Sequence, residues 1–115
     1  MQKSAFMAAA MLLAGSAMAT DASLSDKGKP LAYDNSQGNC LACHMMPTRA
    51  DAEAAGNSGP PLIAMRARFP NKADLRAKIW DATATRPDTL MPPFGKHKAL
   101  TEAEIDAVVE FVYGL

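Results

Sequence analysis

The segment Cys40-Leu41-Ala42-Cys43-His44 carries two thiols three positions apart and an imidazole directly after the second. Thiols at this spacing can each form a thioether to one vinyl edge of a haem, while the histidine reaches the iron from below. The alternatives are a disulfide, half of a zinc site and a thioredoxin-like dithiol. The sequence has no second cysteine pair, no further Cys/His pair at zinc-finger spacing and no predicted strand before the motif. The motif therefore predicts one covalently bound haem c, attached to Cys40 and Cys43, with His44 as an iron ligand.

The length and charge of the chain restrict its fold and its partners. The chain has 115 residues, so it forms a single small domain at most. Its formal net charge is zero, which argues against nucleic acid or an anionic membrane surface as the main partner. A domain this short offsets its conformational entropy only narrowly, so a buried macrocycle would supply a missing part of the core. We expect the apo-protein to be poorly folded.

Residues 1–19 are expected to be a signal peptide. Lys3 gives a positive start, residues 5–14 form an apolar run, and the residues before position 20 form a small-x-small cleavage site that ends at Ala19. The apolar run is about half of the ~20 residues needed to cross a bilayer. We expect cleavage after Ala19, a periplasmic protein without a membrane span, and one domain over residues 20–115. Export alone does not decide between haem and disulfide, because an oxidising compartment permits both.

The first half of the mature chain is predicted to contain little regular structure. Residues 20–27 are polar and are expected to form a loose leader. A short helix is expected over residues 28–37, where Pro30 is tolerated only in the first turn. The Cys–His motif itself should be a helical turn, because a spacing of three brings both sulfurs to one face. Residues 45–58 contain proline, glycine and asparagine and are expected to form a loop.

The second half is predicted to be mainly helical. The expected elements are a helix over residues 62–69, a helix from the N-cap Asn71 towards Ala84, a proline-rich loop over 89–98 and a C-terminal helix. Thr101 and Glu104 form a capping box for this last helix, and its apolar residues recur at helical spacing. Since no segment shows strand alternation, the sequence predicts an all-α domain.

The second axial ligand decides whether a haem carries electrons or binds small ligands. Met45 and Met46 directly follow the first ligand and cannot reach round the porphyrin edge. Met65 falls in a predicted helix, where core packing is the more common role of a methionine. Met91 heads the stiff segment Met-Pro-Pro-Phe-Gly, which can hold a thioether against iron. Met91 is therefore the preferred second ligand, and His97, between two lysines, stays open as the alternative.

With these residues placed, the chain resembles a class I cytochrome c domain with one haem. More closely, it resembles SoxX, the small subunit of the SoxAX cytochrome of bacterial sulfur oxidation. The segments that carry the resemblance are residues 38–44, 59–62, 86–95 and 100–111. The first two are shared by cytochromes c in general, whereas Pro-Asp-Thr-Leu-Met-Pro-Pro-Phe-Gly before a Leu-Thr-x-x-Glu-Ile helix is more specific. The resemblance implies an all-α class I cytochrome c fold wrapped around the haem.

The resemblance also implies roles for residues and partners. His44 and Met91 would be the axial ligands, Cys40 and Cys43 would bear the haem, and the Pro60 carbonyl would accept the imidazole N–H. SoxX-like subunits pair with a larger haem subunit, SoxA, whose haem joins thiosulfate oxidatively to a cysteine of the carrier SoxYZ. Such a complex is an L-cysteine S-thiosulfotransferase. The small subunit would accept the released electrons and pass them to a soluble cytochrome c, without catalysis of its own.

Two further functions stay open, together with the roles of some apolar residues. A free carrier with one haem could serve another periplasmic oxidase or dehydrogenase, and a structural metal or disulfide domain is the third possibility. The partner is expected to cover the haem edge through Met45, Met46 and Phe94, unless these residues point inward. Trp80 could bind a haem propionate through its indole N–H, but its place beside Ile79 favours a core role.

Overall fold

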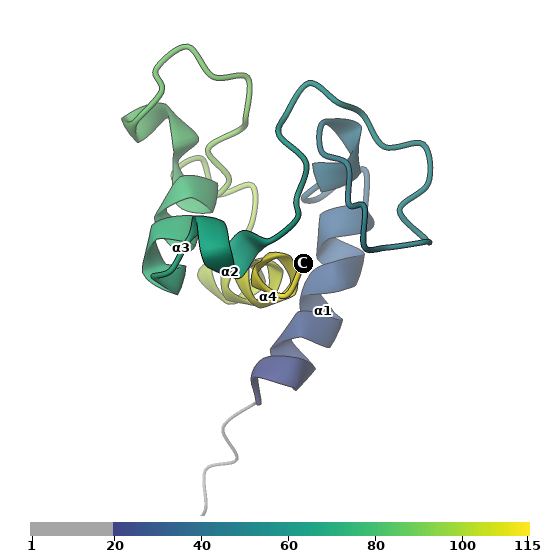
Figure 1. Ribbon diagram of the computed structural model, residues 1–115. Coiled ribbons are helices and arrows are strands. Elements are labelled where there is room, and N and C mark those ends of the chain that lie inside the picture. Colours follow the sequence, from purple (N-terminus) through teal and green to yellow (C-terminus); the bar gives the residue numbers. More distant parts are fainter. Residues whose placement is uncertain (1–19) are drawn as a thin grey trace, which may run out of the picture.

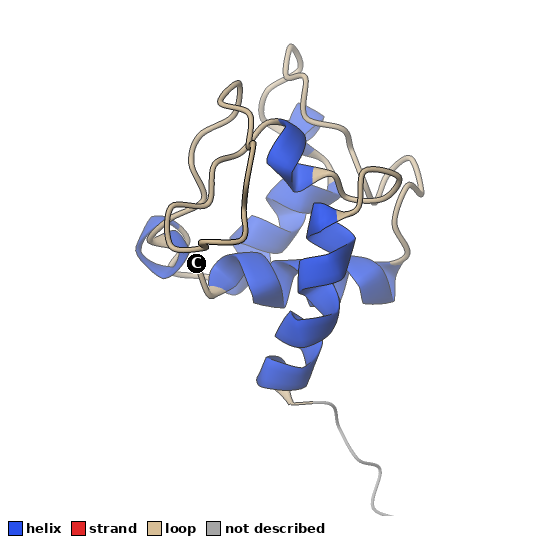
Figure 2. Ribbon diagram, turned by 90° about the vertical axis from the view of Figure 1, so that its right-hand side faces the viewer, coloured by secondary structure: helices blue, strands red, loops and turns tan. Residues whose placement is uncertain are grey.

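Residues 20–115 are the part of the chain that the computed structural model describes. They form helices α1 (Asp21–Tyr33), α2 (Met65–Arg68), α3 (Lys72–Trp80) and α4 (Glu102–Tyr113), and the 3₁₀ turns η1 (Cys40–Ala42) and η2 (Ala82–Ala84). No strand occurs within this range, so the all-α prediction is confirmed (Figures 1 and 2). The expected signal peptide lies outside the described residues. None of the helices within residues 20–115 is long and apolar enough to cross a membrane.

Helices α1 and α4 cross steeply at the centre of the fold, as the two perpendicular views show (Figures 1 and 2). Their close approach requires glycine at position 28, because a Cβ there would lie 1.9 Å from the carbonyl oxygen of Ala107. Nearby, the Tyr33 ring meets the Phe111 ring edge-on, with centroids 5.9 Å apart. Phe111 and Ile105 are among the largest fully buried side chains, so the core is centred on α4.

The N-terminal helix is longer than the sequence predicted. Residues 20–27 form its N-cap and first turns instead of a loose leader, with the side chain of Thr20 as the cap. The helix ends at Tyr33, and Pro30 lies in its interior rather than in a first turn. A proline there removes one helical hydrogen bond and crowds the preceding turn. The packing of α1 on α4 outweighs this local penalty, and local propensity does not include that packing.

Helix α3 begins where predicted and ends earlier. Asn71 caps it through its side chain, and the predicted stripe of Leu75 and Ile79 is buried. The backbone becomes extended at Asp81, with φ −155°, so the helix ends after Trp80 and η2 follows as a separate turn. The short helix α2 is likewise only part of the range expected over residues 62–69.

Helix α4 has the predicted capping box and the predicted buried face. Thr101 Oγ1 accepts a hydrogen bond from the Glu104 N–H at 3.2 Å, and the Glu104 carboxylate accepts one from the Thr101 N–H at 2.8 Å. The apolar positions expected to face the core are all buried: Ile105, Val108, Val109 and Val112. Two ion pairs tie α3 to α4: Lys72 with Glu110 at 2.6 Å and Arg76 with Asp106 at 2.7 Å.

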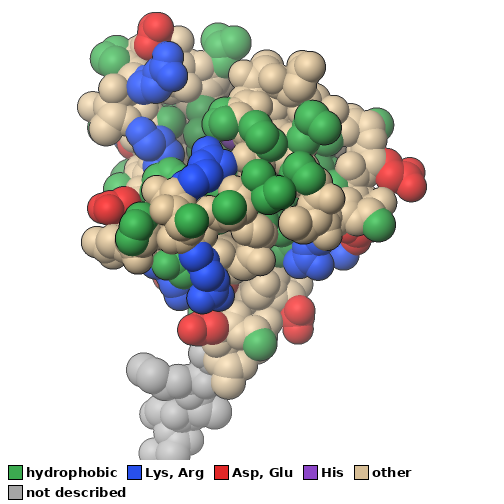
Figure 3. Space-filling view, viewed as in Figure 1, with side chains coloured by type: hydrophobic (Ala, Val, Ile, Leu, Met, Phe, Trp, Pro, Cys, Tyr) green, Lys and Arg blue, Asp and Glu red, His purple; other side chains and the backbone are tan. Residues whose placement is uncertain are grey.

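Two loop-rich lobes rise from this helical layer (Figure 1). We call residues 34–64, which follow α1 and contain η1, the histidine lobe. We call residues 81–100, which follow α3 and contain η2, the methionine lobe. The space-filling view shows the surface hollowed between the upper parts of the molecule, with hydrophobic side chains gathered beside the hollow (Figure 3). The fold therefore presents the Cys–His motif and the Met91 loop on different lobes.

Candidate haem site

The two cysteines lie in a tight turn of the histidine lobe. The Cys40 carbonyl oxygen accepts hydrogen bonds from the backbone N–H groups of Cys43 at 3.2 Å and His44 at 2.9 Å. Both thiols are free and half-buried. Burial raises the pKa of the Cys40 thiol to about 11, whereas a thioredoxin-like reactive thiol needs a lowered pKa. The Cys40 thiol therefore lacks the lowered pKa that a redox-active dithiol of the thioredoxin type needs.

The His44 imidazole is oriented by the chain itself. Its Nδ1 lies 2.6 Å from the Pro60 carbonyl oxygen, so this nitrogen donates its proton there and Nε2 keeps a free lone pair. Gly59 lies against the ring, because a Cβ at this position would be only 2.5 Å from His44 Cε1. The Gly59 N–H also donates to the Cys43 carbonyl oxygen at 2.8 Å. The histidine is thereby prepared to bind a metal through Nε2.

The loop behind the motif is fastened to α1 through Asp51. One carboxylate oxygen pairs with the Lys29 ammonium, and the other accepts a hydrogen bond from the Tyr33 hydroxyl at 3.0 Å. The bonds from Lys29 and Tyr33 lower the pKa of the Asp51 carboxyl. Further along the loop, the Gly56 N–H donates to the Leu41 carbonyl oxygen at 2.8 Å. These contacts hold the loop predicted over residues 45–58 in one conformation against the Cys–His turn.

Met91 lies on the other lobe, half-buried against the edge of the core. Its backbone N–H donates to the Thr89 hydroxyl at 3.2 Å. The next residues are Pro92 and Pro93, which restrict the backbone and keep this segment from becoming helical. Two thiols and one imidazole are the groups that attach a c-type haem and bind one face of its iron, and a thioether is one of the groups that can bind the other face. The residues present therefore fit the haem, and the ligand role of Met91 stays a prediction.

The competing ligands occupy less suitable positions. His97 is exposed at the surface of the methionine lobe. Met65 is only 1% exposed and belongs to the core, and its sulfur accepts a contact from the guanidinium of the exposed Arg68 at 3.4 Å. Met45 is 48% exposed and directly follows His44. These placements favour Met91 as the second ligand, on the lobe opposite His44.

The structure corrects the expected partner surface. Met46 is 3% exposed and Phe94 is 8% exposed, so both belong to the core rather than to an interface. Nearness to the haem motif in sequence says nothing of the direction in which a side chain points. The large apolar residues that do face solvent within residues 20–115 are Met45, Ile63 and Leu90.

Sequence reasoning missed two residues that support the His44 segment. Gly59 provides room for the imidazole, and its place before Pro60 was the only signal of a special backbone position. Arg68, on α2, donates from Nη1 to the Pro61 carbonyl oxygen at 2.7 Å. No sequence pattern indicates that contact, because the two residues meet only through the turn before α2.

Comparisons with known proteins agree with this geometry. The chain matches the family described as "Cytochrome C oxidase, cbb3-type, subunit III" over residues 16–112. It is also similar to a chain in the crystal structure of SoxXA from P. pantotrophus, with a TM-score of 0.70 and 28% sequence identity. That similarity covers 77% of this chain and 79% of the other. No curated protein matched.

Proposed function

We propose that this chain is the electron-transfer subunit of a SoxXA-like complex. The premise is that the chain belongs to the cytochrome c domain family described as "Cytochrome C oxidase, cbb3-type, subunit III". The observation that carries the proposal is the prepared imidazole of His44 beside two free thiols, with a methionine loop on the opposite lobe. The likeness to the SoxXA chain supports this choice within the cytochromes c, because it extends over most of both chains.

One haem c would be held by Cys40 and Cys43 as thioethers and by His44 and Met91 as axial ligands. The haem supplies a one-electron iron couple. The chain supplies the orientation of the imidazole through Pro60 and a neutral thioether from Met91. A thioether favours ferrous iron and raises the potential relative to two imidazoles, which suits an electron acceptor.

The partners follow from the proposed complex. A larger, SoxA-like haem subunit would carry the chemistry, in which thiosulfate is joined to a cysteine of the carrier SoxYZ. This chain would accept the released electrons and pass them to a soluble cytochrome c. The protein would act in the periplasm after removal of residues 1–19. The role is electron transfer, so the catalytic residues would lie on the larger subunit.

The exposed apolar side chains supply the contact with that subunit. Leu90 is 91% exposed and stands next to Met91, and Met45 stands next to His44. The Leu62 N–H donates to the Met45 carbonyl oxygen at 2.8 Å, which brings the exposed Ile63 close to Met45. Exposed apolar residues beside a cofactor site are typical of a protein interface.

Co-expression with a SoxA-like subunit tests the proposal. We expect the two haem proteins to elute together in size-exclusion chromatography, and Leu90→Asp to separate them. Ala99→Asp, an exposed change on the same lobe, should leave the complex intact. If the unmodified protein elutes as a monomer with the partner present, the assignment to a SoxXA-like complex is wrong.

A free electron carrier for another periplasmic dehydrogenase or oxidase is the second candidate, and the family match supports it only in that its description does not name a SoxXA complex. Such a carrier would keep the same haem ligands without a permanent partner. The chromatography above separates the two functions. Retention of colour after acid-acetone extraction, which leaves covalent c-haem in place, distinguishes both from a structural metal or disulfide domain.

A further inference from the structure

The methionine lobe joins the helical layer at Trp80. This residue ends α3, so its carbonyl oxygen has no partner within the helix. It accepts two hydrogen bonds from the lobe, from the Gly95 N–H at 3.1 Å and from the Lys96 N–H at 3.2 Å. Lys96 also places its ammonium 3.4 Å from the Asp81 carboxylate. The end of the Met91 loop is thus fixed to the end of α3.

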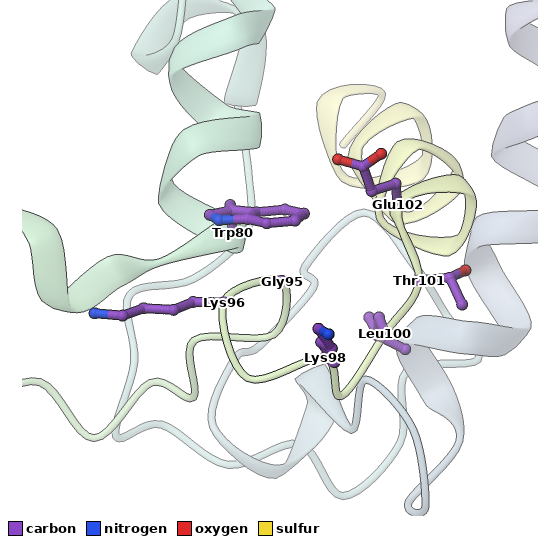
Figure 4. Close-up of a pocket in the computed structure, with 7 residues that line it drawn as sticks. All are labelled: Trp80, Gly95, Lys96, Lys98, Leu100, Thr101 and Glu102. Carbon is purple, nitrogen blue, oxygen red and sulfur yellow. The ribbon is translucent and has the colours of Figure 1, made fainter.

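The indole of Trp80 lies directly over Gly95 (Figure 4). A Cβ on Gly95 would be 2.0 Å from Trp80 Cε3 and 2.2 Å from Cδ2, whereas ordinary contact begins at 3.4 Å. The φ of Gly95 lies outside the positive range, so its lack of a side chain serves this contact and not a turn conformation. The cavity of about 410 Å³ beside the pair is lined by Trp80, Gly95, Lys96, Lys98, Leu100, Thr101 and Glu102 (Figure 4).

The Trp80 ring also has a cationic neighbour on its own helix. The Arg76 guanidinium lies 5.5 Å from the centroid of the indole ring, and Arg76 pairs with Asp106 of α4 at 2.7 Å. The ring therefore has a position defined relative to α4 as well as to α3. A contact with this ring fixes the loop against the core of the molecule.

The other end of the loop has weaker support. Leu90 is 91% exposed, and the contact that holds the Met91 backbone is the bond to Thr89. Pro92 and Pro93 connect Met91 to Phe94, which is buried beside Gly95. Since prolines fix their φ angles, the backbone between Met91 and Gly95 is stiff, and a displacement of Gly95 would also displace Met91.

We propose that Trp80 and Gly95 form a latch that positions Met91 and so sets the strength of its bond to the haem iron. The inference rests on the haem site of the proposed function. Neither residue touches the reacting atoms, so both are positioning residues. A side chain at position 95 would push the loop away from the indole and carry Met91 with it. If the contact served stability alone, the same change would weaken the fold and leave the distal ligand as it was.

The test uses the holoprotein and imidazole as a competing ligand. Gly95→Ala should weaken the far-red band of ferric His/Met haem and raise the affinity for imidazole about tenfold. Covalent attachment should not change. Gly114→Ala is the matched control, because a Cβ there has its nearest neighbour at 3.4 Å, the Phe111 carbonyl oxygen. Normal imidazole affinity and a full band in Gly95→Ala would overturn the latch.

A double-mutant cycle isolates the contact. Trp80→Ala removes the ring but keeps the carbonyl acceptor, so it should raise imidazole affinity to a smaller extent. In that background, Gly95→Ala should add almost nothing, because the alanine then has no ring to meet. Equal effects of Gly95→Ala in both backgrounds would refute the proposal. Should Gly95→Ala give no folded protein, Trp80→Ala alone carries the test, and an unchanged imidazole affinity overturns the latch.

Met91→Ala separates the latch from the haem site on which it rests. If this change leaves the spectrum and the imidazole affinity unaltered, Met91 is not the ligand and the site assignment fails. If Met91→Ala opens the iron to imidazole and neither latch variant does, the ligand assignment stands and the latch alone is wrong.

Discussion

The histidine lobe and the methionine lobe hold their functional side chains in different ways. His44 is held by its own side chain, through the 2.6 Å bond to the Pro60 carbonyl and the contact with Gly59. The Met91 thioether offers no N–H or O–H to donate, so its position depends on the backbone around it. Besides the bond of the Met91 N–H to Thr89, that backbone is fixed at Gly95, four residues away. One ligand is therefore set by contacts of its own side chain, and the other depends in part on a distant contact and is open to change by remote substitutions.

Loss of both thioethers should have the largest effect, because it removes the covalent attachment of the haem, which would take one axial ligand from each lobe. In Cys40→Ala, Cys43→Ala we expect no covalent haem and little folded protein, since the haem serves as cofactor and as core. Purification yield and thermal unfolding followed by circular dichroism measure this. Holoprotein of normal yield and stability, or a cooperative transition in haem-free wild type, would contradict the expectation.

Met91→Ala should affect the methionine lobe alone. We expect loss of the far-red band, access for exogenous ligands and a midpoint potential lowered by well over ~59 mV, the change that corresponds to tenfold for one electron. Covalent attachment and the His44 contacts should remain. Redox titration and absorption spectra give the answer, with His97→Ala as the control that should change neither. An unchanged Met91→Ala spectrum would instead indicate His97 or Met65.

Gly59→Ala tests the histidine lobe in the same manner. A Cβ at Gly59 would lie 2.5 Å from His44 Cε1 and 3.0 Å from Nε2, so the imidazole must shift away from the Pro60 carbonyl. We expect the free energy of unfolding to fall by about 1–3 kcal/mol, as for overpacked sites. The control Gly114→Ala should stay within about 0.5 kcal/mol. Equal urea midpoints for Gly59→Ala and wild type would show that the ring is not confined.

The smallest effect should come from the attachment of the histidine lobe to α1. The pKa of Asp51 is lowered by its bonds to Lys29 and Tyr33, so these bonds contribute stability above the ordinary carboxyl value of 3.8 and lose it as the pH falls further. Both partners are substantially exposed, and the contribution is accordingly small. Urea unfolding of wild type and Asp51→Asn should differ at pH 7 and converge at pH 3. A difference that stays constant would exclude this linkage.

Local signals in the sequence predicted local structure well. The Asn71 cap, the capping box of Thr101 and Glu104 and the turn at Cys40 depend on neighbours a few residues away, and all three are present. The first turns of α1 were missed, because α1 as a whole is stabilised by its packing on α4. Pro30 was misplaced for the same reason.

The residues of the candidate site were likewise predictable only where the signal was local in the sequence. The motif identified the thiols and His44, since their spacing in sequence is the chemical requirement itself. The direction of Met46 and Phe94 was not predictable, because it depends on which side of the loop meets the core. The contact of Gly59 with the His44 ring is likewise a meeting of segments that only the folded chain brings together.

The contact of Gly28 with Ala107 has a consequence for the order of events during synthesis. It joins helices near opposite ends of the described chain, and closing a loop of that length costs about 4 kcal/mol of chain entropy. At 5–20 residues per second, roughly 4–16 s separate the synthesis of the two residues. Until α4 has been made, α1 lacks the helix against which it packs. The first and last helices of the described chain can therefore join only when nearly the whole chain is available.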